Sequence, residues 1–347
     1  MTKRLAVVLF NLGGPDKPAS VRPFLFNLFS DPAIIRLPQP LRWLVARLIS
    51  GRREKTAQEI YARLGGRSPI LPLTEKQAAA LTEAIEGLGL GVETRCFIAM
   101  RYWHPRAAET AKAVSDFAPD EVVLLPLYPQ FSTTTTASSF AEWRKAAAKA
   151  GIAAKTASIC CYPVEQGWVQ AQSLLIGKAL DAMGDTPFRL LFSAHGLPKK
   201  VVEAGDPYQD QVEMTAKAVV AALGRKDLDW VVSYQSRVGP LEWIAPYTEA
   251  EIRRAGEAGL ALVVVPIAFV SEHSETLVEL DIEYRELAEH AGVSRYIRVP
   301  AVGDEPAFIA GLARLVATAR GHARCAPDGG ARICNASRSG CACISER

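Results

Sequence analysis

Short runs of aliphatic and β-branched residues alternate along the chain with longer segments that have the apolar spacing of amphipathic helices. Several short runs are almost uninterrupted in their hydrophobic residues, which is typical of parallel strands covered by helices on both faces. The predicted strands are 5–10, 93–99, 121–127, 154–160, 189–193, 230–234, 260–268 and 295–299. The predicted helices include 74–88, 105–117, 139–150, 169–182, 210–223 and 277–291.

The order of these signals repeats. We therefore predict an α/β protein of two similar, Rossmann-like halves, each a four-stranded parallel sheet flanked by helices. The predicted parts are an N-terminal half, 1–165, a C-terminal half, 166–320, and a cysteine-rich tail, 321–347. Ligands of open α/β sheets bind beyond the carboxyl ends of the strands. An active-site cleft between the halves, lined by those ends, is the expected site.

The composition is that of a globular protein with an ample core. Of 347 residues, 49% are hydrophobic and 22% are charged, and the formal net charge is +3. Lys and Arg are scattered, so the charge pattern does not indicate a nucleic-acid-binding surface. The apolar run at 5–10 is too short for a signal peptide, and no run reaches the roughly 18 apolar residues of a membrane span. We therefore expect a cytoplasmic protein.

His195 is the first candidate for chemistry. A predicted strand ends at Ser193, and Gly196 and Pro198 favour a turn that presents His195 at the strand end. A neutral imidazole can accept a proton or bind a metal near neutral pH. The alternative is a histidine that only hydrogen-bonds the turn.

A row of carboxylates follows another predicted strand end. Glu275, Glu279 and Glu283 are spaced i, i+4, i+8 on one helix face, with Glu272 close by. Such a row could conduct a divalent cation or protons away from a cleft. The alternative is a solvated helix face, which is the usual place for charged residues.

Two further segments hold unusual residues. The glycine pairs in 11–15 and 64–69 match neither a dinucleotide-binding fingerprint nor a P-loop, so we expect no nucleotide cofactor. The segment from Phe24 to Phe29 is apolar enough to line a pocket for a large flat ligand or to make peripheral contact with a membrane. An ordinary buried helix explains it equally well.

Five motifs in this chain resemble those of the ferrochelatase family. They are LFSAHGLP at 191–198, FVSEHSETLVELDIEY at 269–284, YQSRVGP at 234–240 followed by Trp243, MRYWHP at 100–105, and NLGGP at 11–15. The match follows the family's order over roughly residues 4–320. The resemblance implies a chelatase-type fold and an enzyme, a lyase, that inserts Fe²⁺ into protoporphyrin IX. The products are protohaem and two protons, in the last step of haem biosynthesis.

The resemblance also assigns roles to residues. His195 and Glu275 are the implied catalytic pair that handles the proton and the Fe²⁺ substrate, and the implied acidic relay comprises Glu272, Glu279 and Glu283. The implied porphyrin-binding residues are Leu12, Ser68, Arg101, Tyr102 and Trp243. Leu12 stands where the family often has Met, which preserves an apolar contact.

The cysteines raise a separate question. Four of the seven lie in the last 23 residues, and Cys334, Cys341 and Cys343 resemble the C-terminal ligands of a [2Fe–2S] cluster in some ferrochelatases. The loop 132–139, where animal members place the fourth ligand, has no cysteine. The remaining candidates are Cys160, Cys161 and Cys325. The alternative is a tail with free thiols.

Other functions stay open at this stage. Coproporphyrin III could replace protoporphyrin as the substrate, and another tetrapyrrole chelatase would load cobalt or nickel. A non-catalytic haem-binding protein would need an axial ligand but no acidic relay. A nucleotide-dependent oxidoreductase is weakened by the missing phosphate loop. The sequence leaves the oligomeric state undetermined.

Overall fold

The chain forms two compact units. The computed structural model describes residues 2–322, 325–328 and 330–343. The first unit comprises 1–161, 312–333 and 342–347, and the second comprises 162–311 and 334–341. The tail therefore contributes residues to both units.

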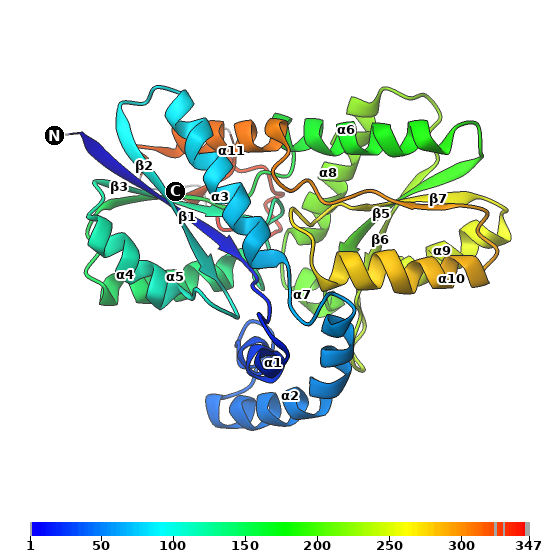
Figure 1. Cartoon of the computed structure of the whole chain (residues 1–347), viewed down its shortest axis with the longest axis horizontal. Helices are drawn as coiled ribbons and strands as arrows, with labels where there is room; N and C mark the ends of the chain where they lie inside the picture. Colours follow the sequence, from blue (N-terminus) through cyan, green and yellow to red (C-terminus); the bar gives the residue numbers. More distant parts are fainter. Residues whose placement is uncertain (1, 323–324, 329, 344–347) are drawn as a thin grey trace. The chain divides into compact units, whose positions relative to one another are not determined.

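The first unit is built on a five-stranded parallel sheet with the order β2-β1-β3-β4-β9. The strands are β1 (Lys3–Asn11), β2 (Val92–Met100), β3 (Glu121–Pro126), β4 (Lys155–Ile159) and β9 (Cys325–Ala326). In Figure 1, α4 (Ala107–Phe117) and α5 (Thr136–Lys149) cover one face, and α3 (Ile70–Gly87) and the end of α11 (Pro306–Ala319) cover the other. Leu5 to Leu9 are completely buried as a result.

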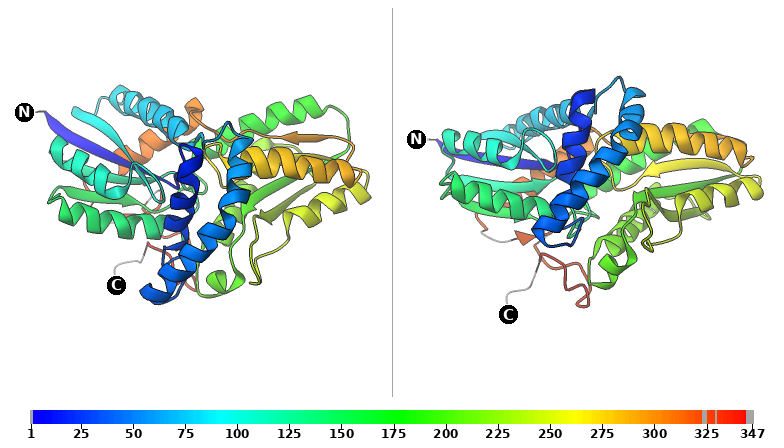
Figure 2. Two further views of the ribbon diagram at one scale, coloured as in Figure 1. Left: turned by 60° about the horizontal axis from the view of Figure 1, so that its bottom comes forward. Right: turned by 90° about the horizontal axis from the view of Figure 1, so that it is seen from below.

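Two more helices extend the first unit. After a short 3-10 turn, η1 (Pro18–Ser20), α1 (Val21–Phe29) leads to the long α2 (Gln39–Ala62). These two helices lie side by side (Figure 2). Phe24, Leu25 and Tyr61 form a small core with Tyr102, so part of the aromatic-rich segment is an ordinary buried helix face.

The second unit is built on a four-stranded parallel sheet with the order β6-β5-β7-β8. Its strands are β5 (Phe188–His195), β6 (Trp230–Gln235), β7 (Ala261–Pro266) and β8 (Tyr296–Arg298). One face is covered by α6 (Gln166–Met183), α7 (Lys199–Glu203) and α8 (Tyr208–Leu223), and the other by α9 (Thr248–Glu257) and α10 (Tyr284–His290). β7 is buried along its whole length, as its unbroken apolar run requires.

The prediction of an α/β fold with two parallel sheets is confirmed, and all eight predicted strands are present. The prediction of four strands in the first sheet is wrong. The two residues of β9 pair with Ser158 and Ile159 of β4 and add a fifth strand. Two residues are too few for a period-2 pattern to register.

The segment that carries the predicted carboxylate row also differs from expectation. Residues Glu275–Glu283 form a π-helix, η2, and only Tyr284–His290 continue as the α-helix α10. The N-cap residue of this π-helix is Ser274. Over nine residues the apolar spacing of π- and α-helices is too similar for the sequence to separate them.

No helix in the described part of the chain combines the length and the apolar character that crossing a bilayer needs.

Candidate functional site

His195 is the last residue of β5, where it pairs in register with Gln235 at the end of β6. The backbone N–H of Gly196 donates to the Gln235 carbonyl at 2.9 Å. A Cβ atom at Gly196 would lie 3.1 Å from that carbonyl oxygen and 3.2 Å from the Trp243 ring. Glycine at this turn therefore lets the Trp243 indole approach the backbone beside His195.

His195 forms a close pair with Glu275. Its Nδ1 atom lies 3.0 Å from Glu275 Oε2, and His273 Nε2 lies 3.6 Å from the same oxygen. Burial alone would raise the pKa of Glu275, but His195 and His273 hold it well below its usual range. Glu275 is therefore ionised and can only accept, so His195 Nδ1 donates the hydrogen and Nε2 carries the lone pair.

The negative charge of Glu275 also changes the pKa of the His195 imidazole. Burial would lower the pKa of His195, but the charge and hydrogen bond of Glu275, with a smaller contribution from Glu279, raise it above its ordinary value. The His195 side chain remains 38% exposed. It is thus both accessible and poised to take up a proton.

Glu279 lies in a different environment. Its carboxylate accepts hydrogen bonds from Gln235 Nε2 at 3.0 Å, from Ser236 Oγ, and from Tyr284 OH at 3.0 Å. Burial and the nearby charge of Glu275 raise the pKa of Glu279 despite these bonds. The pKa of Glu275 is thus lowered and that of the neighbouring Glu279 is raised. Such a difference is typical of catalytic sites in which one carboxylate stays charged and the other exchanges a proton.

A buried hydroxyl network fixes Gln235. Ser193 Oγ donates to Gln235 Oε1 at 2.7 Å, and Thr248 Oγ1 lies within hydrogen-bond distance of both Ser193 and Ser233. Because the Gln235 oxygen is engaged by Ser193, its NH₂ group faces Glu279 and the backbone carbonyl of Glu275. Sequence reasoning missed this network, since its members come from three separate elements.

The other two predicted relay residues, Glu272 and Glu283, have different surroundings from Glu279. Glu272 Oε1 accepts from Arg298 Nη1 at 2.8 Å and from the Ala301 N–H at 3.0 Å. Glu283 is exposed at the end of the π-helix. Of the four carboxylates in the predicted row, Glu275 and Glu279 are the pair that the structure brings beside His195.

Trp243 borders the same site. Its ring stands nearly perpendicular to the His195 ring, with centroids 6.3 Å apart, and its Nε1 donates to the Val238 carbonyl at 3.1 Å. This bond orients the half-buried indole next to the imidazole.

The predicted porphyrin-binding residues Arg101 and Tyr102 lie in the first unit. The Arg101 guanidinium donates to Asp31 and Ser138, each at 2.8 Å, and to Glu142 at 3.1 Å. Tyr102 OH donates to the same Asp31 oxygen at 2.8 Å and is fully buried. Both residues are therefore engaged in a polar cluster around Asp31.

Ser68 and Leu12 belong to the same unit. Ser68 lines a cavity of about 420 Å³ together with Arg67, Trp103 and His104. A Cβ atom at Gly14 would lie 2.5 Å from the Ser68 side chain, so the glycine is needed for this close approach. Leu12 packs against the core around Phe24 and Tyr102.

Five cysteines belong to the first unit: Cys96, Cys160, Cys161, Cys325 and Cys343. Cys160 Sγ lies 3.6 Å from Cys161 Sγ. The pKa of the Cys160 thiol is raised, chiefly by its hydrogen bond with Cys161. A hydrogen bond with Cys325 lowers this pKa, whereas burial and the charges of Cys161 and Cys343 raise it further. Cys334, in the second unit, accepts from Gln211 Nε2 at 3.1 Å. Among the described residues, no three His, Cys, Asp or Glu side chains are arranged to hold a single metal ion.

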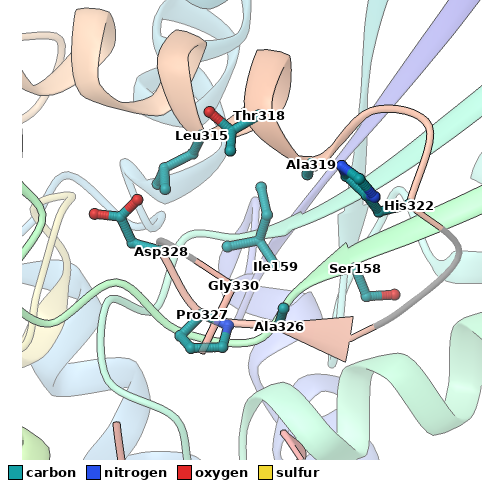
Figure 3. Close-up of a pocket in the computed structure, with 10 residues that line it drawn as sticks. All are labelled: Ser158, Ile159, Leu315, Thr318, Ala319, His322, Ala326, Pro327, Asp328 and Gly330. Carbon is teal, nitrogen blue, oxygen red and sulfur yellow. The ribbon is translucent and has the colours of Figure 1, made fainter. Parts of the chain in front are cut away.

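A small cavity lies between α11 and the strands β4 and β9. Leu315, Thr318 and Ala319 of α11 line one side, and β4 and β9 line the other (Figure 3). Its volume is about 80 Å³. Pockets for drug-sized ligands occupy about 300–1,000 Å³, so this cavity has room for water or a small ion and none for a tetrapyrrole.

Comparison with known proteins decides the family. The family model described as Ferrochelatase matches residues 4–320. The chain belongs to the ferrochelatase family. It is 58% identical over 324 residues to the ferrochelatase of Caulobacter vibrioides (strain NA1000 / CB15N), covering 93% of this chain and 92% of that protein. It is 56% identical to the ferrochelatase of Phenylobacterium zucineum (strain HLK1), covering 98% of each. Ferrochelatases are metal chelatases that insert metal into porphyrin for haem synthesis.

Solved structures support the fold. The chain is similar to SirB from Bacillus subtilis with Fe³⁺, with a TM-score of 0.54 and 13% identity over 92% of this chain and 96% of that one. It is also similar to CbiX, described as the terminal enzyme for siroheme biosynthesis in denitrifying bacteria, with a TM-score of 0.50 and 15% identity over 91% and 99% of the two chains. At such low identity these likenesses establish the chelatase fold alone.

Proposed function

We propose that this ferrochelatase inserts Fe²⁺ into protoporphyrin IX with release of two protons, as the lyase of the last step of haem biosynthesis, and that His195 and Glu275 carry the chemistry. The observation that carries the proposal is the 3.0 Å contact between His195 Nδ1 and Glu275 Oε2 at the carboxyl end of β5. It leaves Nε2 of a partly exposed imidazole free to face a substrate.

The proposed proton transfer follows from this geometry. Insertion removes two hydrogens from pyrrole nitrogens as protons, and Fe²⁺ takes their place. Neutral His195 accepts a proton at Nε2, and the Glu275 carboxylate stabilises the imidazolium that forms. Glu279, with its raised pKa, is suited to pass protons onward. Glu275 stays anionic and offsets the charge of the incoming cation.

Trp243, Leu12, Ser68, Arg101 and Tyr102 are the proposed porphyrin-binding residues. Trp243 offers an aromatic wall beside His195. A pocket that favours a bent macrocycle would expose the nitrogen lone pairs and so bind the transition state better than the planar substrate.

Charge favours protoporphyrin over coproporphyrin. Coproporphyrin carries four propionates and protoporphyrin two, and each buried carboxylate needs a cation or several donors. Arg101 is already paired with Asp31 and Glu142, which limits what it can offer a further carboxylate. Anaerobic assays of the purified chain with Fe²⁺ and each porphyrin test this. We expect the haem spectrum to develop faster with protoporphyrin IX; faster turnover of coproporphyrin III would reverse the assignment, and no turnover with either would refute the proposed function.

A [2Fe–2S] cluster is the proposed resident cofactor. An all-thiol donor set suits iron–sulfur chemistry. Cys334, Cys341 and Cys343 are proposed as three ligands. Cys160 is proposed as the fourth, because it directly follows β4 and because the charge of Cys343 contributes to the raised pKa of its thiol. When bound, the cluster would supply a one-electron redox centre.

Protein purified without oxygen tests the cluster. We expect iron, sulfide and visible charge-transfer bands in the wild type, and their loss in Cys160→Ser. Cys96→Ser in β2 is the matched control and should retain them. Absence of iron and sulfide from the wild type would contradict the cluster, and a cluster that survives Cys160→Ser would exclude Cys160 as its ligand.

We propose peripheral membrane contact through α2 and the segment before it, together with the exposed parts of α1. Phe24 is only 5% exposed, whereas six large apolar side chains between 34 and 48 are 39–54% exposed: Ile34, Leu37, Leu41, Trp43, Leu44 and Leu48. Exposed Arg36, Arg47, Arg52 and Arg53 accompany them, which suits an anionic lipid surface. Leu44→Asp should reduce co-sedimentation with anionic vesicles, and Leu174→Asp on α6 should not. Equal binding by both variants would contradict the contact.

A further inference from the structure

Arg298 is a buried cation in the second unit that the chemistry described above leaves unused. It is the last residue of β8, and its side chain is 9% exposed. Its Nη1 donates to Glu272 Oε1 at 2.8 Å, and its Nε lies 3.2 Å from Asp281 Oδ2. An arginine this deeply buried must be paired to be tolerated.

The two partners of Arg298 bracket the catalytic carboxylates. Glu272 lies three residues before Glu275, and Asp281 lies two residues after Glu279. One guanidinium on β8 therefore ties both ends of the segment that presents the two carboxylates. Arginine is suited to this task, because its planar fork can engage two acceptors at once while a lysine ammonium is a point charge.

Neighbouring contacts reinforce the same attachment. The Ala301 N–H shares the Glu272 oxygen at 3.0 Å. Arg285 Nη2 donates to Asp281 at 2.6 Å, and Arg285 Nη1 donates to the Tyr296 carbonyl of β8 at 3.0 Å. Tyr296 OH also donates to the Leu280 carbonyl. The π-helix is thus bound to β8 at several points, and Arg298 contacts one residue just before the helix and one near its end.

A π-helix needs such support. Its i→i+5 hydrogen bonds pack the backbone less favourably than those of an α-helix, and it occurs mostly as a single turn. Here it runs for nine residues, Glu275–Glu283. If this segment rewound toward an α-helix, the positions of Glu275 and Glu279 relative to His195 would change.

We propose that Arg298 is a positioning residue for metal insertion, holding Glu272 and Asp281 so that the π-helix presents Glu275 to His195. This inference rests on the proposed function of His195 and Glu275. Arg298 touches neither of them and takes no part in proton transfer. Loss of its contacts would act on the rate of insertion and leave porphyrin binding intact.

Kinetics of Arg298→Met and Arg298→Lys in the full-length protein test the proposal. Removal of residues that orient a catalytic group typically reduces activity about 10- to 100-fold. We expect kcat with Fe²⁺ to fall by about that factor in Arg298→Met and by less in Arg298→Lys, while KM for porphyrin stays within about twofold. Should Arg298→Met fail to fold, the kcat of Arg298→Lys decides alone, and a wild-type value would overturn the proposal.

Arg189→Met is the matched control. Arg189 is also a mostly buried arginine of the same sheet, 17% exposed, with Asp229 at 3.1 Å and Glu251 at 3.9 Å. It lies near the amino end of β5, and among the described residues it forms no hydrogen bond or ion pair with the π-helix. We expect it to lower stability without lowering kcat per folded molecule. Equal loss of kcat in the two variants would mean that Arg298 has only a general structural role.

A double-mutant cycle with Glu275→Gln separates the inference from the function on which it rests. If Arg298 acts through Glu275, adding Arg298→Met to Glu275→Gln should reduce kcat by no more than about twofold further. Independent, multiplicative losses would overturn the inference while the proposed function stands. Wild-type kcat in Glu275→Gln alone would instead refute the proposed role of Glu275.

Discussion

Replacement of Glu275 by Gln removes a charge and keeps the shape of the side chain. In the wild type the carboxylate accepts from His195 Nδ1 at 3.0 Å, so the variant loses a charge-assisted hydrogen bond to the imidazolium that forms during proton transfer. Hydrogen bonds to charged groups contribute about 1.5–3 kcal/mol, and 1.36 kcal/mol corresponds to a tenfold change in rate. Because His195 is 38% exposed and solvent screens the pair, we expect the lower part of that range, a fall in kcat of about 10- to 30-fold.

The pH dependence of Glu275→Gln should change in a defined direction. The Glu275 charge raises the pKa of His195, and the proposed base must be neutral to accept a proton. Activity therefore rises as the pH increases through the pKa of His195. Without the carboxylate that pKa falls, and the acid limb of the profile moves to lower pH.

Anaerobic haem formation, followed by absorbance over a pH series, measures both effects, and quenching of tryptophan fluorescence reports porphyrin binding. Glu289→Gln, an exposed glutamate on α10, is the control and should match the wild type. Wild-type kcat in Glu275→Gln, or an acid limb that stays in place, would refute the reasoning.

Two further predictions concern the first unit. Gly14→Ala places a Cβ atom 2.5 Å from the Ser68 side chain. Overpacking of this kind typically costs about 1–3 kcal/mol, so thermal unfolding should occur at a lower temperature than in the wild type. An unchanged unfolding temperature would mean that the contact can relax. Asp31→Ala leaves Arg101, 11% exposed, without one of its carboxylate partners and leaves Tyr102 OH without its acceptor. Breaking a buried ion pair typically costs about 3–5 kcal/mol, and the remaining partner Glu142 places the expected loss near the lower end in urea unfolding; a loss within error of zero would show that water replaces Asp31.

The strands and the presence of two parallel sheets were accessible from the sequence because they depend on local patterns and on the order in which those patterns repeat. Buried parallel strands such as β7 read as unbroken apolar runs, and the repeated order of signals implied two similar sheets. β9 was not accessible, since a two-residue strand has no periodicity. Its place in the sheet depends on pairing with β4, far away in the chain.

The candidate site was accessible only in part. His195 and Glu275 stand at ends of predicted elements, where the rule for open α/β sheets directs attention. Glu272 carries the same charge as Glu275 and lies close to it in the sequence. Its partner, however, is Arg298, which lies 26 residues away on β8. Likewise Asp31 lies 70 residues from Arg101. Which carboxylate pairs with which cation depends on tertiary contacts that no local pattern encodes.

The His195→Ala variant tests most directly whether the imidazole accepts the pyrrole proton. Metal insertion and porphyrin binding are measured in the same anaerobic preparation of this variant. Removal of the group that accepts the pyrrole proton should reduce insertion of Fe²⁺ by about 100-fold or more, as general-base catalysis contributes about 10²–10⁴-fold, while the porphyrin still quenches tryptophan fluorescence with near-wild-type affinity. A His195→Ala protein that forms haem at the wild-type rate would contradict the account.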